Sequence, residues 1–246
     1  HVNRLPAPQL DSELSIRLIC VQPNISWRTA YYSFENNEFF KQINTHLVTL
    51  ANQAAAVVAD GVFVFPELTI SDFNSQNRLL QQTFDAITRG EYGLIIGARA
   101  GDHNTILGIN AEGQIQSRYQ KQRLVPVFEQ AEPKSKGLSG VLHVDNTGYK
   151  LGFTLCYELL FPDLFKSLVA KDADIIGAIS FNTWLGNNNW PLLHAAYLPL
   201  RAVENGKPAV FVNNNGPSMV CDRFGRIINR LPVGQEGVMV VEVDNG

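Results

Sequence analysis

The chain has 246 residues, of which 45% are hydrophobic and 17% are charged. This composition is typical of a globular protein with a sizeable core, arranged as one large domain or two small ones. The net charge of −3 and the lack of any Lys/Arg cluster exclude the strongly basic surfaces that bind nucleic acids. No apolar run approaches the roughly 18 residues of a membrane-spanning helix. Three cysteines cannot all pair within one chain, so we expect no disulfide framework.

The first half of the chain predicts a tail, a strand and a helix, followed by further strands. Residues 1–15 are polar and rich in proline, which is typical of a linker or flexible tail. Apolar residues between Phe39 and Ala59 follow the 3.6-residue period and predict an amphipathic helix. Further strands are predicted at 15–22, 61–65, 92–101, 104–110 and 115–121. The last two are joined by a hairpin turn, "AEGQ", and a second helix is predicted at 77–87.

The second half predicts a hairpin over 140–156 that turns at "DNTG", followed by a helix from Phe161 to Ala170. One longer helix is expected over 191–206; it closes at Gly206, and Pro199 is expected to kink it. Strands are also predicted at 173–182 and 236–243. Between them, residues 208–231 are predicted as a strand, a loop and a hairpin around "DRFG". Strands and helices alternate with hairpins between them, which predicts a single mixed α/β domain with two sheets over residues 16–246.

The stretch "LGFTLCYELLFPDLF" places Cys156 at the end of an apolar strand, just before a helix that starts near Pro162. A residue at such an elbow is held rigidly and can face a cleft, which is where a nucleophile belongs. An ordinary buried cysteine fits the same pattern. Cys20 and Cys221 lie inside apolar strand-like runs, and we expect both to be inert core residues.

A thiol nucleophile needs a base to take its proton, and a cation or N–H donors to hold the oxyanion that its attack creates. No Cys/His pattern in the sequence is convincing as a source of that base. Glu67 and Lys121 each follow an apolar strand, as Cys156 does, so all three can meet at one edge of the sheets. Taken alone, a glutamate after a proline and a lysine after a strand are more typical of a solvated surface.

The motifs "FPEL", "RYQKQRLVP" and "LCYE", in that order, resemble the nitrilase or carbon–nitrogen hydrolase superfamily. The likeness is greatest to the catalytic domain of the apolipoprotein N-acyltransferases, and it continues through "SFNTWLGN", "RAVENGKP" and "NNNGPS". It spans roughly Ile16 to Val243. The resemblance implies an α-β-β-α four-layer sandwich with two mixed sheets and a Glu–Lys–Cys triad. Related domains also occur attached to membrane segments in conjugal-transfer proteins.

The resemblance also implies a role for each matching residue. Glu67 would be the general base, Lys121 the oxyanion-binding ammonium, and Cys156 the nucleophile that forms a thioester. Glu129 would orient Lys121 and the leaving group. The Tyr157 backbone N–H would complete the oxyanion hole, and Glu158 would be a buried carboxylate that holds the elbow.

The segment "FNTWLGNNNW" is expected to shape a substrate pocket, with Asn182, Trp184 and Trp190 as binding residues. Two tryptophans that pack a long loop onto the core are the competing interpretation. His194 is expected to make a hydrogen bond within the core and not to contact the substrate. No spacing of Cys, His and Asp matches a metal site, and no Gly-rich phosphate loop is present in the sequence.

These inferences predict a cofactor-free thiol enzyme that cleaves an amide or ester carbonyl, with hydrolysis of a small amide as the leading outcome. The alternatives are an N-acyltransferase that moves a fatty acyl group from phospholipid to a lipoprotein amine, and a non-catalytic interaction domain. We expect a small amide or acyl donor as partner, no nucleic acid, and membrane association only through segments outside this chain; a homo-oligomer is compatible. Because the chain starts at His1, we expect a trimmed piece or a mature form. Its location would be the periplasmic face of a bacterial inner membrane if it belongs to a membrane protein, and the cytoplasm otherwise.

Overall fold

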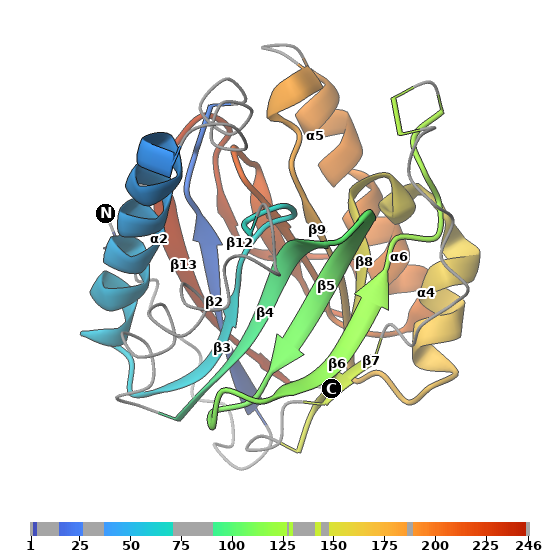
Figure 1. Ribbon diagram of the computed structural model, residues 1–246. Coiled ribbons are helices and arrows are strands. Elements are labelled where there is room, and N and C mark those ends of the chain that lie inside the picture. Colours follow the sequence, from blue (N-terminus) through green and yellow to red (C-terminus); the bar gives the residue numbers. More distant parts are fainter. Residues whose placement is uncertain are drawn as a thin grey trace.

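Two mixed β-sheets stacked face to face form the centre of the molecule, with helices on both outer surfaces (Figure 1). The computed structural model describes residues 2–3, 15–26, 37–70, 91–126, 128–129, 141–143, 148–185 and 189–244. The α2 helix covers one sheet, and α4, α5 and α6 cover the other. This arrangement confirms the predicted α-β-β-α four-layer sandwich. The predicted helix at 77–87 and most of the "DNTG" turn lie outside the described residues.

The first sheet has seven strands in the order β1-β13-β2-β3-β4-β5-β6. The inner strands β2, β3 and β4 run parallel, and the β5 and β6 strands extend the sheet as antiparallel neighbours. Of the predicted tail, Val2–Asn3 pair in parallel with β13. The strands are β1 (Val2–Asn3), β2 (Ser15–Gln22), β3 (Asp60–Val64), β4 (Glu91–Ala100), β5 (His103–Ile109), β6 (Ile115–Gln120) and β13 (Gly237–Asp244).

The second sheet has six strands in the order β12-β11-β10-β9-β8-β7, with β8, β9 and β10 parallel at its centre. The predicted "AEGQ" and "DRFG" turns are confirmed, since Gly113 and Gly225 take positive φ angles of 80° and 76° between paired antiparallel strands. The strands are β7 (Val141–His143), β8 (Lys150–Leu155), β9 (Ile175–Ser180), β10 (Ala209–Asn213), β11 (Ser218–Cys221) and β12 (Ile227–Leu231).

The helices agree with the predictions except at one break. The predicted helix from Phe39 is α2 (Asn37–Ala55), and the one after Phe161 is α4 (Pro162–Val169). The single helix predicted over 191–206 is in fact two, α5 (Trp190–Ala195) and α6 (Tyr197–Asn205). Pro199 has no N–H to bond to the Ala195 carbonyl, and its ring crowds that carbonyl, so the chain breaks there rather than kinking at the proline. None of the described helices is long and apolar enough to cross a membrane.

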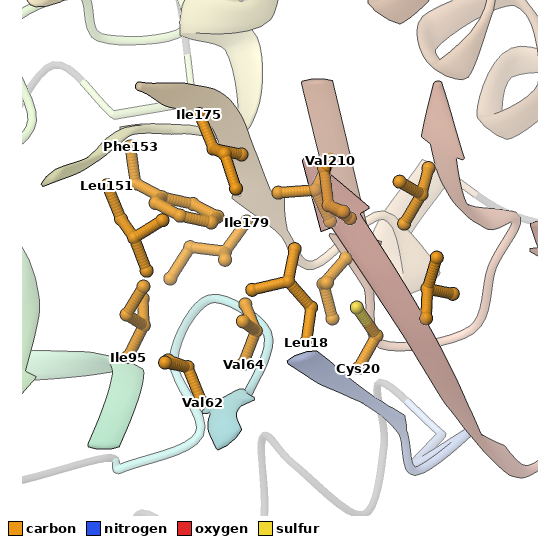
Figure 2. Packing of buried hydrophobic residues seen from close by; sticks show 14 of the residues in the cluster. Leu18, Cys20, Val62, Val64, Ile95, Leu151, Phe153, Ile175, Ile179 and Val210 are labelled. Carbon is orange, nitrogen blue, oxygen red and sulfur yellow. The ribbon is translucent and has the colours of Figure 1, made fainter. Parts of the chain in front are cut away.

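The main core fills the space between the two sheets. Figure 2 shows Leu18, Val62 and Ile95 of the first sheet facing Phe153 and Val210 of the second. Outer layers of apolar side chains join α2 to the first sheet and α4, α5 and α6 to the second. Residues that follow the carboxyl ends of β3, β6, β8 and β9 contact one another at one end of the sandwich.

Candidate active site

Cys156 stands at a sharp turn between β8 and the short 3-10 helix η1 (Cys156–Leu160). Its φ angle is +49°, in the left-handed region that residues other than glycine seldom adopt. The strand Lys150–Leu155 before it is paired in parallel with β9, so the turn begins from a fixed strand end. The predicted elbow is therefore confirmed, with one turn of 3-10 helix inserted before α4.

Lys121 directly follows β6 and lies between two carboxylates. Its Nζ donates to Glu67 Oε1 at 3.0 Å and to Glu129 Oε1 at 2.7 Å. Lys121 and Glu67 are 2% and 3% exposed. A buried lysine is stable as an ammonium only when opposite charges surround it. The site therefore carries a fixed positive charge beside Cys156.

Glu67 is held by donors on both of its oxygens. Asn104 Nδ2 donates to Oε1 at 2.7 Å, beside Lys121, and the backbone N–H of Phe181 donates to Oε2 at 2.8 Å. Asn104 is the second residue of β5, and Phe181 follows β9. These contacts fix the carboxylate between the two sheets. Asn104 was missed in the sequence, because a lone asparagine at a strand start has no distinctive pattern.

The charges of the site act on one another. Burial favours the neutral amine of Lys121, but Glu67, Cys156 and Glu129 outweigh it and raise its pKa above the ordinary value. Burial, reinforced by Glu67, raises the pKa of the Cys156 thiol to about 12, although Lys121 opposes the rise. At neutral pH the resting sulfur is therefore a thiol, and its attack on a carbonyl needs a base that takes the proton as the bond forms.

Glu158 connects the nucleophile elbow to the loop that follows Lys121. Its Oε2 accepts from Leu155 N at 2.8 Å and from Tyr119 Oη at 2.7 Å. Its Oε1 accepts from Gln122 N at 2.5 Å and Arg123 N at 2.9 Å. Burial raises the pKa of Glu158, whereas these donors lower it. One carboxylate thus ties the residue before Cys156 to the two residues after Lys121.

A cavity of about 270 Å³ opens onto Cys156. Trp184 lies on one side of it and contacts Phe128, with 5.0 Å between the ring centroids. Two polar side chains, those of Asn182 and His194, line the cavity beside Cys156: Asn182 Oδ1 lies 3.7 Å from the sulfur, and His194 Nε2 lies 2.9 Å from the Cys156 carbonyl oxygen. The walls are otherwise apolar or aromatic and comprise Val125, Tyr157, Leu160, Trp184, Trp190, Leu193 and Tyr197.

The structure brings the predicted site residues to one end of the sandwich. Glu67, Lys121 and Glu129 are in direct contact, and the charges of all three reach the Cys156 thiol. The predicted pocket residues Asn182, Trp184 and Trp190 line the cavity, together with Tyr157. Residues 186–188 of the predicted pocket segment lie outside the described part of the chain. The roles inferred for these residues stay predictions.

Comparison with known proteins shows the family to which this chain belongs. The profile of the carbon–nitrogen hydrolase family matches residues 20–246, and the chain belongs to this family. Among curated proteins, the chain is 30% identical to an apolipoprotein N-acyltransferase of Allorhizobium ampelinum over 266 residues, which cover 96% of this chain and 49% of that protein. It is 31% identical to an apolipoprotein N-acyltransferase of Pseudomonas putida over 154 residues, covering 55% of this chain and 30% of that protein. The chain thus spans about half the length, or less, of these relatives.

Solved structures show the same fold. Nit3 of Saccharomyces cerevisiae, a member of branch 10 of the nitrilase superfamily, superposes with a TM-score of 0.70 at 22% identity; the match covers 94% of this chain and 90% of that one. An amidase from Nesterenkonia sp. also has a TM-score of 0.70, at 17% identity, covering 97% of this chain and 94% of that one. The predicted superfamily and the predicted enzyme class are confirmed.

Proposed function

We propose that this domain transfers an apolar acyl group from an ester or amide to an amine through a thioester on Cys156. The observation that carries this proposal is an apolar cavity that opens onto a buried thiol beside a Lys121–Glu67 ion pair. An apolar wall recognises a hydrocarbon chain, whereas a small polar amide would leave that wall without a partner. The apolipoprotein N-acyltransferase relatives support the same choice.

The proposed mechanism uses the contacts described above. Glu67 takes the proton of the Cys156 thiol while the sulfur bonds to the carbonyl carbon. The Lys121 ammonium and the Tyr157 backbone N–H hold the oxyanion. When the oxyanion collapses, the bond to the leaving group breaks, and that group receives the proton from Glu67. An amine then attacks the thioester carbonyl carbon and gives a proton to Glu67; the C–S bond breaks, the acyl amide leaves, and the sulfur takes the proton from Glu67, which restores the thiol.

Hydrolysis of the thioester is the second candidate, because water can resolve the same intermediate in place of an amine. The same base and the same oxyanion donors serve either acceptor, so the residues around Cys156 do not separate the two reactions. If this domain belongs to a longer membrane protein, we propose the periplasmic face of a bacterial inner membrane as its place. In that setting a phospholipid would be the acyl donor.

Trapping the acyl-enzyme tests this proposal. We expect the p-nitrophenyl ester of octanoic acid to add one octanoyl group to Cys156, as measured by mass spectrometry of the intact and digested protein. Cys156→Ala should abolish the adduct, while the matched control Cys221→Ala should keep it, because Cys221 is buried in β11 away from the cavity. An adduct on Cys20 or Cys221, with Cys156 free, would refute the assignment.

The acceptor is identified by how the adduct decays. A primary amine should shorten the lifetime of the octanoyl-enzyme and yield the octanoyl amide as product. A lifetime that does not change with amine concentration, with octanoic acid as sole product, would favour the hydrolase and contradict acyl transfer.

Trp184→Ala is expected to weaken selection of the acyl group. Trp184 is 37% exposed and forms part of the cavity wall. Its removal should lower kcat/KM for the octanoyl ester, and the fall should correspond to a loss of about 1–3 kcal/mol in transition-state binding. The acetyl ester, which is too short to need the wall, should react nearly as before. Phe224→Ala is the matched control, since Phe224 is an exposed ring outside the cavity. Unfolding of Trp184→Ala would show instead that this ring packs the loop onto the core.

A further inference from the structure

His194 of α5 contacts the nucleophile, although it is not one of the residues to which the proposed mechanism gives a role. Its Nε2 lies 2.9 Å from the backbone carbonyl oxygen of Cys156, and its Nδ1 lies 3.0 Å from Asn182 Nδ2. The ring also packs edge-on against Phe211, with 5.2 Å between centroids. The hydrogen bonds expected for a core histidine are therefore present, and one of them ends on the nucleophile residue itself.

The partners determine which ring nitrogen of His194 carries the proton. A carbonyl oxygen only accepts hydrogen bonds, so Nε2 must be the donor to Cys156. Burial lowers the pKa of His194 to about 4, so the ring is neutral near pH 7 and Nδ1 has no proton. Nδ1 is then the acceptor for the Asn182 amide N–H. Both contacts are satisfied by a single tautomer.

The same tautomer orients the Asn182 amide. With Nδ2 turned to His194, Oδ1 faces the other way, where it accepts from Ser180 Oγ at 2.8 Å and lies 3.7 Å from Cys156 Sγ. A thiol can donate weakly to this oxygen. Two sets of contacts therefore link His194 to Cys156. One passes through Asn182 to the sulfur, and the other joins the ring directly to the Cys156 carbonyl.

The contact with the carbonyl has a geometric consequence for the oxyanion hole. In a trans peptide the C=O of one residue and the N–H of the next lie in one plane and point in opposite directions. The peptide between Cys156 and Tyr157 contains both the carbonyl bound by His194 and the N–H proposed to hold the oxyanion. Cys156 has a positive φ of 49°, a conformation that the backbone does not favour, and the 2.9 Å contact with His194 Nε2 anchors the peptide that follows it.

We propose that His194 is a positioning residue that orients the Tyr157 N–H toward the reacting carbonyl by holding the Cys156 carbonyl on the opposite side of the same peptide. This inference rests on the proposed acylation of Cys156. In this role, His194 of α5 acts on the reaction through the backbone of Cys156 and does not contact the reacting atoms. Asn182 has the supporting role of keeping the ring in the required tautomer and rotamer.

Two reactions of the same thiol separate this role from ordinary packing. Acylation by p-nitrophenyl octanoate passes through an oxyanion and needs the Tyr157 N–H. Alkylation by iodoacetamide displaces iodide at a saturated carbon: the sulfur bonds to carbon, iodide leaves with the electron pair, and no oxyanion forms. The ratio of the two rate constants at Cys156, followed by mass spectrometry, therefore reports on the oxyanion hole.

The side chains of asparagine and glutamine each reproduce half of the His194 contacts. His194→Gln can keep a donor near the Cys156 carbonyl, whereas His194→Asn can keep only the partner of Asn182. We expect His194→Asn to lower the acylation rate about 10- to 100-fold while changing the alkylation rate less than threefold. His194→Gln should recover most of the acylation. His46→Asn is the matched control, because His46 pairs with Glu236 and Pro23 away from the cavity.

The outcomes divide clearly. A wild-type protein that is alkylated but never acylated overturns the proposed function, and this inference with it. Wild-type acylation, together with equal losses of acylation and alkylation in His194→Asn, overturns the positioning role alone and leaves the proposed function in place. If His194→Asn does not fold, His194→Gln decides, because a selective loss of acylation in a variant that keeps the Nε2 donor would contradict the inference.

Discussion

Replacing Lys121 with methionine is expected to lower the free energy of unfolding by about 3–5 kcal/mol and to slow acylation of Cys156 by about 10²- to 10³-fold. Methionine has a similar length but no charge, so the Glu67 and Glu129 carboxylates that share the Lys121 ammonium would face each other unpaired. Urea denaturation and the octanoyl-transfer assay measure the two effects.

The pH dependence of the Lys121→Met loss follows from like-charge repulsion. With the ammonium removed, the two carboxylates repel each other when both are ionised, and a proton bound in the folded state relieves that repulsion. A folded state that binds more protons than the unfolded state gains stability as the pH falls. The loss should therefore be largest at neutral and alkaline pH and should shrink on acidification.

Two further variants check the Lys121 interpretation. The double variant Lys121→Met/Glu129→Gln should recover part of the lost stability at neutral pH, because only one of the facing carboxylates remains. Lys150→Met, which removes a surface ion pair with Asp172 at 3.3 Å, is the matched control and should change the free energy of unfolding by no more than about 0.5 kcal/mol. Full stability and normal acylation in Lys121→Met would refute the assignment of a buried ammonium.

Glu158→Gln is expected to cost about 1–3 kcal/mol in the free energy of unfolding and to reduce acylation, although the change is isosteric. The carboxylate accepts from the backbone N–H groups of Leu155, Gln122 and Arg123 and from the Tyr119 hydroxyl. An amide has only one acceptor oxygen, so its NH₂ must face donors on one side. The Tyr119 hydroxyl can rotate to accept, but at least one backbone N–H loses its partner.

Tyr119→Phe is the matched control for Glu158→Gln. It removes one donor and leaves Glu158 with its three backbone partners, so it should cost about 0.5–1.5 kcal/mol and leave acylation nearly unchanged. Acylation is measured below the unfolding transition of both variants, so that only folded protein is compared. Equal acylation by Glu158→Gln and the wild-type protein would show that the elbow keeps its geometry without this carboxylate.

Much of the architecture could be predicted because its patterns are local. The 3.6-residue period predicted α2 to within four residues at each end, and the apolar run before Cys156 predicted β8. Turn residues such as Gly113 predicted a hairpin, because a positive φ at that position favours glycine. The break between α5 and α6 was missed, because a kink at Pro199 and a break one turn before it have the same sequence pattern.

The candidate site was only partly predictable. Glu67, Lys121 and Cys156 became candidates because each follows an apolar strand, but only the resemblance favoured a function for them, since a glutamate or lysine after a strand is more often a solvated residue. Their approach to one another depends on the curvature and stacking of the two sheets, because β4 and β5 separate β3 from β6 in the first sheet and β8 belongs to the second. Periodicity reports which face of an element is buried, but it does not report which distant element lies against that face.

By itself, then, the sequence determined the composition of the core, the class of the fold, the elbow at Cys156 and the kinds of side chain available for thiol chemistry. Only the tertiary structure decided how those side chains are paired: Lys121 between two carboxylates, Glu158 with four donors, and His194 against the Cys156 carbonyl. The physical reason is that hydrogen bonds act over about 3 Å, whereas their partners are separated along the chain by whole strands and helices. The two stacked sheets, which close those separations, therefore set the electrostatics of the site.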